Sequence, residues 1–292
     1  MGAEQGLRAG ARRPQREFIV VGTPIAHSMS PVMHRAAYEA LGIDDAVYGR
    51  AEVHEGELEA FLAGPGSGLQ GLSVTMPLKR EAFELAVDAD DVSHGLGISN
   101  TLIRRPDGSW RAENHDVDGI ARSLHDHGVD RIDRAAIIGS GATALSAVAA
   151  LTGMGAREIV LTARRTERLE PVVAAAEVRG ARCTVSDWTD RLAALTEDVV
   201  VSALAIEGAD DLAAEVRATP AAPVPRVMLD VLYDPWPAPL AAAVQERGTE
   251  VASGLRMLAH QAARQVESML GVPSAPAELM LAAARAHLAA RG

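Results

Sequence analysis

The stretch RAAIIGSGATALS, residues 134–146, decides the fold class of this chain. Its apolar part, residues 135–138, predicts a short buried strand, and the alanine-rich segment after the glycines predicts a helix. Between them, Gly139, Gly141 and Ala144 fit the pattern G-x-G-x-x-A. A strand, a glycine turn and a helix in this order are typical of a dinucleotide-binding unit, so we expect a doubly wound α/β sheet.

This glycine turn also predicts an anion site. The first glycine permits a tight turn, and the second lets backbone amides approach a pyrophosphate. The helix N-terminus adds free N–H groups and the positive end of the helix dipole. A glycine turn between a strand and a helix can also be purely structural, and that alternative stays open here. The residues expected to contact the dinucleotide are Gly139, Ser140, Gly141, Ala142 and Thr143.

Two arginines indicate which dinucleotide would bind. Folds that bind NAD usually carry Asp or Glu at the end of the second strand, where the carboxylate holds the ribose 2′-hydroxyl. Here the predicted second strand, residues 158–163, leads to Arg164 and Arg165. A carboxylate would repel a 2′-phosphate, whereas a guanidinium can bind it through two hydrogen bonds. The pair therefore favours NADP, the alternative being two arginines on a solvated surface.

The residues before this unit predict a second, mixed α/β arrangement. Apolar runs predict strands over residues 18–21, 46–53 and 69–75, and helical spacing predicts helices over residues 30–41, 55–62, 82–90 and 116–128. Pro106-Asp107-Gly108 predicts a hairpin between two short strands, which makes the sheet mixed. We expect a disordered tail over residues 1–16, a substrate-binding and catalytic domain over residues 17–116, and a Rossmann-type domain over residues 117–254.

The composition excludes several classes of partner. The net charge of −11 argues against nucleic acid or an anionic membrane as the main partner, and no apolar run is long enough to span a bilayer. Cys183 is the single cysteine, so no disulfide can form within the chain, as fits a reducing cytoplasmic compartment. His125 and His127 lie two residues apart without further ligands nearby, so we expect no metal site. A small molecule in a local pocket is the expected partner.

Three segments of the first region carry small polar side chains at predicted strand ends. They are residues 22–31 (GTPIAHSMSP), residues 73–79 (SVTMPLK), and residues 99–101 (SNT) together with residues 114–116 (NHD) after the hairpin. Open α/β sheets bind their ligands at this edge. Short hydroxyl and amide side chains supply the many donors and acceptors that a polyhydroxylated ligand needs.

Taken together, these segments resemble the shikimate dehydrogenase family, over nearly the whole chain from Phe18 to Leu270. The resemblance implies oxidation of the C3 hydroxyl of shikimate by NADP⁺, with the metabolic direction being reduction of 3-dehydroshikimate. It implies Lys79 and Asp116 as the catalytic pair. The residues that it implies for the substrate are Ser28, Ser30, Thr75, Asn100, Tyr233 and Gln261.

The late segments of the chain extend this resemblance. Residues 230–235 (DVLYDP) and residues 254–262 (GLRMLAHQA) are similar to family segments that contact substrate and nicotinamide. They imply Val231, Gly254 and Met257 as further cofactor contacts. The resemblance also implies that residues 255–292 return as helices to complete the first domain, and the chain is expected to be a monomer or a homodimer.

Two departures from the family pattern bear on the substrate. His115 stands where the family usually has Thr, and Ser73 where it usually has Asn, so we expect both to lie beside the ligand and to affect its preference. Whether Lys79 or the coupled pair with Asp116 carries the proton stays open. The alternative functions are an NAD-preferring quinate/shikimate dehydrogenase, a dehydrogenase of a shikimate analogue, and a regulatory paralogue that binds ligands without turnover.

Overall fold

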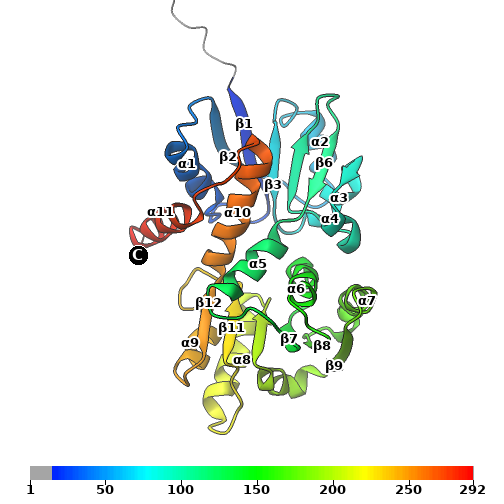
Figure 1. Cartoon of the computed structure of the whole chain (residues 1–292), viewed down its shortest axis with the longest axis vertical. Helices are drawn as coiled ribbons and strands as arrows, with labels where there is room; N and C mark the ends of the chain where they lie inside the picture. The colour runs from blue at the N-terminus through cyan, green and yellow to red at the C-terminus, as the bar shows by residue number, and fades with distance from the viewer. Residues whose placement is uncertain (1–14, 292) are drawn as a thin grey trace, which may run out of the picture.

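Two six-stranded sheets form the frame of the molecule, one above the other in Figure 1. The computed structural model describes residues 15–291. The chain completes the first sheet before it enters the second, and helices cover both. This architecture confirms the predicted α/β class.

The first sheet is mixed, as the hairpin signal predicts. Its strands are β1 (Arg16–Gly22), β2 (Ala46–Glu52), β3 (Gly71–Val74), β4 (Asp88–Ala89), β5 (Thr101–Arg104) and β6 (Trp110–Glu113), in the order β2-β1-β3-β5-β6-β4. β1 pairs in parallel with β2 and β3, whereas β5 is antiparallel to both β3 and β6. β1 lies inside the sheet because Phe18, Val20 and Val21 are all buried, the continuous apolar run typical of a strand covered on both faces.

The helices of this part connect its strands. They are α1 (Ser30–Ala40), α2 (Leu58–Ala63), α3 (Lys79–Leu85), α4 (Asp91–Leu96) and α5 (Asp116–His125). α1 begins with Pro31 in its first turn, where a missing N–H costs no hydrogen bond, and it buries Met33, Ala37 and Tyr38. α3 and α5 begin at Lys79 and Asp116, so both side chains stand at helix starts.

The second sheet is entirely parallel. Its strands are β7 (Arg134–Ile138), β8 (Glu158–Thr162), β9 (Arg182–Ser186), β10 (Val199–Ser202), β11 (Val227–Asp230) and β12 (Glu250–Ser253). Their order, β12-β11-β10-β7-β8-β9, places the first strand of the unit beside its second and fourth strands, which is the doubly wound order of dinucleotide-binding folds. The helices between them are α6 (Ala142–Gly153), α7 (Glu170–Val178), α8 (Ile206–Ala218) and α9 (Pro239–Gln245).

The last two helices tie the halves together. α10 (Gly254–Leu270) begins at the second sheet and runs up to the first, where α11 (Ala277–Ala289) lies beside α1 (Figure 1). Ser253 caps α10, because its Oγ accepts the Arg256 N–H at 3.3 Å. Met257 joins the core of the second sheet, whereas Leu255 and Val266 join the core beneath α1. The helix therefore crosses from one core to the other.

Several sequence expectations were wrong in detail. Arg16 is not part of a tail: it begins β1, pairs with Ala46, and its guanidinium bonds Asp45 at 2.7 Å, while residues 1–14 lie outside the described part. The helix expected over residues 82–90 begins earlier and ends at Leu85. β4 and α4 follow it, and β9 and β12 were not predicted.

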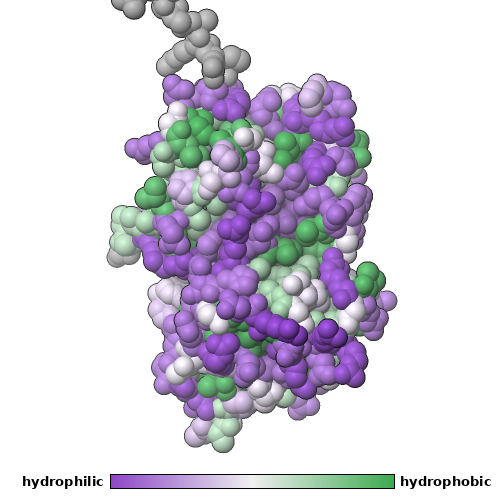
Figure 2. All heavy atoms as spheres, viewed as in Figure 1, coloured by the Kyte–Doolittle hydropathy of each residue, from purple (hydrophilic) through white to green (hydrophobic). Residues whose placement is uncertain are grey.

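The face seen in Figure 2 is largely hydrophilic, with a paler, more apolar area in the middle over the alanine-rich α6. Within residues 15–291, no helix combines the length and apolarity that crossing a bilayer requires.

Candidate active site

A cavity of about 290 Å³ collects the residues that the sequence singles out. Every substrate-side and catalytic residue of the prediction lines it: Ser28, Ser30, Thr75, Lys79, Asn100, Asp116, Tyr233 and Gln261. Four of the predicted cofactor residues, Thr143, Val231, Gly254 and Met257, complete the wall from the side of the second sheet. The cavity thus lies where the two halves of the molecule meet.

Lys79 and Asp116 form an ion pair in this cavity. The Lys79 ammonium donates to Asp116 Oδ2, and the two side chains are only 11% and 7% exposed. Two helix starts bring them together, one after β3 and one after β6. A charged pair shielded from water in this way interacts more strongly than a surface pair, and it places a positive charge and a proton beside any ligand in the cavity.

Asn100 joins this pair to α10. Its Nδ2 donates to Asp116 Oδ1 at 2.8 Å and to Gln261 Oε1 at 3.0 Å. The Gln261 Nε2 donates one N–H to the Leu258 carbonyl at 3.0 Å, which leaves the other N–H for a ligand. Asp116 therefore accepts hydrogen bonds at both oxygens, one from Lys79 and one from Asn100.

The Ser28 and Ser30 turn lies at the start of α1. Ser28 Oγ accepts the Ser30 N–H at 3.3 Å, and both residues line the cavity together with Tyr233. Burial raises the pKa of Tyr233, so its hydroxyl stays protonated and can donate. These three hydroxyl groups of the cavity wall can bind a carboxylate.

The glycine turn fits a bound dinucleotide. Gly139 has a φ of +131°, and a Cβ there would lie 2.6 Å from the Ala203 carbonyl oxygen, so this position requires glycine. Gly141 is the N-cap of α6, and no side chain caps that helix. Space is open around the position of a Gly141 Cβ, so an anion can reach the uncapped amides.

Arg164 and Arg165 stand beside this turn. The Gly139 N–H donates to the Thr162 carbonyl at 2.8 Å, and the two arginines follow Thr162 after one residue. Both side chains are exposed and lie outside the cavity, as do Gly139, Ser140, Gly141 and Ala142. Their place at the end of β8 is the one where dinucleotide-binding folds recognise the adenosine ribose.

Gly254 fills a position with no room for a side chain. A Cβ there would lie 2.0 Å from the Val231 carbonyl oxygen. We expect Gly254→Ala to lower the free energy of unfolding by about 3 kcal/mol or more, because the start of α10 must move away from β11. Urea denaturation followed by circular dichroism measures this loss. Gly153→Ala is the control, since a Cβ at Gly153 meets nothing within 4 Å. Wild-type stability in Gly254→Ala would contradict the close approach.

His115 does not line the cavity, although the sequence led us to expect it beside the ligand. Its Nε2 lies 3.1 Å from Glu113 Oε2. Glu113 also accepts hydrogen bonds from Ser268 on α10 and from Arg111. Burial alone would raise the pKa of Glu113, but these partners outweigh it and lower the pKa to about 2. The cluster joins β6 to α10 behind the site.

This cluster predicts a dependence of stability on pH. Because the folded-state pKa of Glu113 lies below its ordinary value of 4.5, its stabilising contribution is present above pH 4.5 and is lost as the pH falls toward 2. We expect Glu113→Gln to lower Tm by about 3 to 6 °C at pH 7. The difference from wild type should shrink when both proteins are scanned between pH 4.5 and 3. A constant difference across that range would show that the charge of Glu113 is not responsible.

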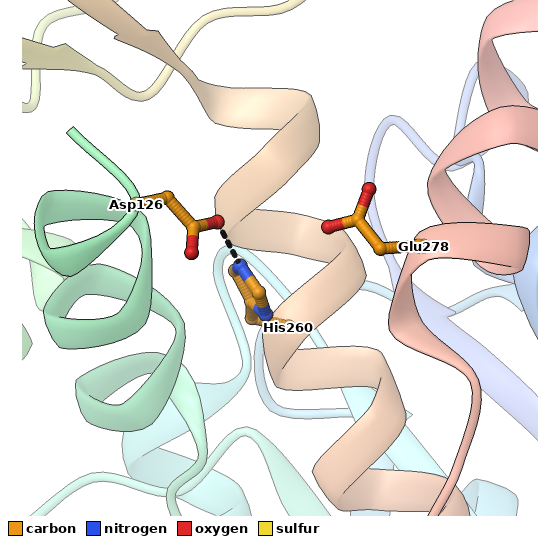
Figure 3. Close-up of side chains that lie close together, drawn as sticks. All are labelled: Asp126, His260 and Glu278. Carbon is orange, nitrogen blue, oxygen red and sulfur yellow. Dashed lines mark hydrogen bonds and ion pairs between the residues drawn. The ribbon is translucent and has the colours of Figure 1, made fainter.

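A second cluster of titratable side chains lies where α5, α10 and α11 meet. Figure 3 shows Asp126, His260 and Glu278 pointing toward one another, with His260 Nε2 2.8 Å from Asp126 Oδ2. The guanidinium of Arg256 bonds Asp126 at 2.7 Å and Glu278 at 2.9 Å. Because this guanidinium already places a positive charge between the carboxylates, we interpret the cluster as a network of ion pairs between helices.

Sequence reasoning missed several residues of the cavity wall. Ser73 does line the cavity, as expected, but Gln265 was not predicted. The sequence could have indicated Gln265, because it lies four residues after Gln261 and therefore on the same face of α10. The other residues of the wall that were not predicted are Val20, Pro24, Ile25, His27, Val74 and Leu258.

Comparison with known proteins identifies relatives of this chain in sequence and in structure. Residues 20–102 match the family described as "Shikimate dehydrogenase substrate binding domain". A "Shikimate dehydrogenase (NADP(+))" from Dinoroseobacter shibae is 35% identical over 273 residues, which cover 90% of this chain and 95% of the relative. A relative of the same description from Methylobacterium radiotolerans is 34% identical over 261 residues, covering 86% of this chain and 90% of the relative. The crystal structure of Mycobacterium tuberculosis shikimate dehydrogenase superposes with a TM-score of 0.81 and 39% identity, covering 93% of this chain and 99% of that one. This chain belongs to the shikimate dehydrogenase family.

Proposed function

We propose that this protein catalyses the reversible, NADPH-dependent reduction of 3-dehydroshikimate to shikimate. The observation that carries the proposal is the shielded Lys79–Asp116 pair in a cavity with hydroxyl and amide donors on one side and the glycine turn of the second sheet nearby. The relatives described above are shikimate dehydrogenases that use NADP⁺. Site and family therefore indicate the same reaction.

The substrate would be held by its carboxylate and hydroxyl groups. Ser28, Ser30 and Tyr233 would bind the carboxylate, since their hydroxyls line the cavity at the start of α1. Thr75, Asn100 and Gln261 would bind the ring hydroxyls. Gln261 has one N–H directed to neither of its protein partners, so it can donate to the ligand without loss of an existing bond.

Lys79 would act on the reacting oxygen at C3. Its ammonium would donate a hydrogen bond to the carbonyl of 3-dehydroshikimate and deliver the proton as that oxygen gains charge. Asp116 would hold the ammonium in place through their ion pair. When bound, NADPH supplies the hydride. The proton and the positive charge thus come from this chain.

The cofactor would extend from the cavity along the second sheet. The nicotinamide would lie near Val231, Gly254 and Met257, which line the cavity. The pyrophosphate would bind at the uncapped N-terminus of α6, and Arg164 and Arg165 would bind the 2′-phosphate. We further propose that residues 17–116 and 255–292 form the substrate unit and residues 117–254 the cofactor unit.

Steady-state rates with shikimate and quinate, each against NADP⁺ and NAD⁺, test the proposal. We expect the highest kcat/KM for shikimate with NADP⁺. Replacing shikimate with quinate, or NADP⁺ with NAD⁺, should lower kcat/KM about 10-fold or more, because the cavity and the arginines after β8 would bind shikimate and the 2′-phosphate. A preference for quinate with NAD⁺ would support the alternative of an NAD-preferring quinate/shikimate dehydrogenase. Binding of both ligands without turnover would support a regulatory paralogue. Neither alternative is favoured by the NADP⁺-dependent relatives.

A further inference from the structure

Gln265 lines the cavity, yet the nitrogen and the oxygen of its amide both bond protein groups. It is 1% exposed, and its Oε1 accepts the Ser73 hydroxyl at 2.7 Å. Its Nε2 donates to the Asn100 carbonyl at 3.0 Å and to Thr101 Oγ1 at 2.9 Å. Both N–H groups are therefore used, and none is left for a ligand. Gln265 can therefore act on the reaction through these protein neighbours.

The Asn100 carbonyl determines the orientation of this amide. A backbone carbonyl can only accept, so the atom of Gln265 that faces it must be the nitrogen. The oxygen then faces Ser73, whose hydroxyl must donate to it. Ser73 Oγ in turn accepts from Tyr48, at 2.5 Å, and burial raises the pKa of Tyr48 so that its proton stays in place. Ser73 thus directs its proton to the protein and not into the cavity.

The hydrogen bonds continue from Gln265 toward the catalytic pair. Because Thr101 Oγ1 accepts from Gln265, its own proton goes to Asn100 Oδ1 at 2.8 Å. The His115 backbone N–H donates to the same oxygen at 3.0 Å. The Asn100 oxygen is thereby satisfied, and its Nδ2 faces Asp116 Oδ1, whose other oxygen bonds Lys79. One continuous chain of buried hydrogen bonds leads from Tyr48 to Lys79.

We propose that Gln265 is a positioning residue for the reaction: through Thr101 it holds the Asn100 amide against Asp116, and so it keeps the Lys79–Asp116 pair aligned in the cavity. This inference rests on the proposed function, since it concerns the same site. Gln265 also anchors α10, which carries Gln261, to the end of β3 and the start of β5. Its loss would loosen two of the groups that contact the substrate.

The test compares four single variants, and the double variant that combines Gln265→Met with Thr101→Val, at a temperature well below the Tm of each. Gln265→Met keeps the length of the side chain and removes its hydrogen bonds, and Thr101→Val removes the hydroxyl that receives them. Thr101→Ser keeps that hydroxyl and is the conservative rescue. Thr249→Val is the matched control, because it also removes a buried hydrogen bond, from Thr249 Oγ1 to the Pro225 carbonyl at 2.8 Å, away from the site.

We expect Gln265→Met and Thr101→Val each to lower kcat about 10-fold, with the KM for NADP⁺ changed less than about two-fold, because only the alignment of the reacting groups is lost. In the double variant, kcat should fall by no more than about 20-fold relative to wild type, because both changes break the same chain of hydrogen bonds. Thr101→Ser and Thr249→Val should keep kcat within about two-fold of wild type.

Three results would overturn the positioning role. The first is a kcat of Gln265→Met within two-fold of wild type. The second is a loss of kcat of about 100-fold in the double variant, which is the product of the two single losses and would show that the residues act independently. The third is a loss of kcat in Thr101→Ser as large as in Thr101→Val. If Gln265→Met does not fold, the two Thr101 variants decide the question alone. A wild-type protein without shikimate turnover would overturn the proposed function as well, so the two failures are distinguishable.

Discussion

Replacing Lys79 with alanine is expected to lower kcat about 10³-fold while the KM for shikimate changes less than about five-fold. The reason is that the ammonium acts on the oxygen whose charge develops during the reaction, whereas the ground-state substrate is held by several other groups. Lys79 lines the cavity and bonds Asp116, and both side chains are shielded from water. Steady-state kinetics in both directions measure the effect.

Lys79→Arg provides the sharper control for this prediction. Lys79 is the only lysine in the sequence, because the other 27 of its 28 Lys and Arg residues are arginines. A guanidinium keeps the positive charge but does not give up its proton in proteins. We therefore expect Lys79→Arg to stay at least about 10²-fold below wild type in kcat, although it can still pair with Asp116. Near-normal turnover in either variant would remove Lys79 from the catalytic pair.

The second large effect concerns the cofactor. We expect the double variant Arg164→Ala and Arg165→Ala to raise the KM for NADP⁺ about 10- to 100-fold, which corresponds to the loss of charge-assisted hydrogen bonds to the 2′-phosphate. The KM for NAD⁺, which lacks that phosphate, should change less than about two-fold. Initial rates with each cofactor at saturating shikimate measure both values.

Arg226→Ala is the control for this pair. Arg226 is also an exposed arginine, placed before β11 and not at the end of β8, so its loss changes the net charge without touching the proposed phosphate site. It should leave both KM values unchanged. Equal increases in the KM for NADP⁺ and for NAD⁺ in the double variant would contradict the role in 2′-phosphate binding.

The main elements of both sheets could be predicted because their strands are short apolar runs with clear ends. Residues 18–21 and 135–138 are such runs, and they form most of β1 and β7. The glycine turn was recognisable because Gly139 needs a positive φ and close contact with Ala203. The cavity residues were assigned through the resemblance of their motifs to the shikimate dehydrogenase family, and the fold brings these motifs together at strand ends.

The missed elements lack those signals. β9 (Arg182–Ser186) is an edge strand with no buried residue, so its sequence shows no apolar run. β4 has only two residues, and its neighbour α4 depends on a cap, in which Asp90 accepts the Ser93 N–H at 2.7 Å. Such elements are stabilised by tertiary contacts, which local propensity does not report.

The direction in which a side chain points was harder to predict than the segment that contributes to the site. His115 precedes Asp116, and the sequence suggested that it would face the ligand. In the folded protein it turns to Glu113, because a buried imidazole needs a partner and Glu113 is within 3.1 Å. The orientation of Gln265 likewise depends on the Asn100 carbonyl, a partner 165 residues away in sequence.

The most direct test of the proposed reaction is NADPH oxidation by the purified protein with 3-dehydroshikimate, with the product identified by mass spectrometry and chromatography. The Lys79–Asp116 pair in its cavity predicts stoichiometric formation of shikimate in the wild type. It also predicts a rate at least about 10²-fold lower in Asp116→Asn, which keeps the shape of the side chain but not its charge. Wild-type protein that binds both ligands and forms no shikimate would contradict the proposed reaction. An Asp116→Asn variant that turns over normally would contradict the role of the Lys79–Asp116 pair.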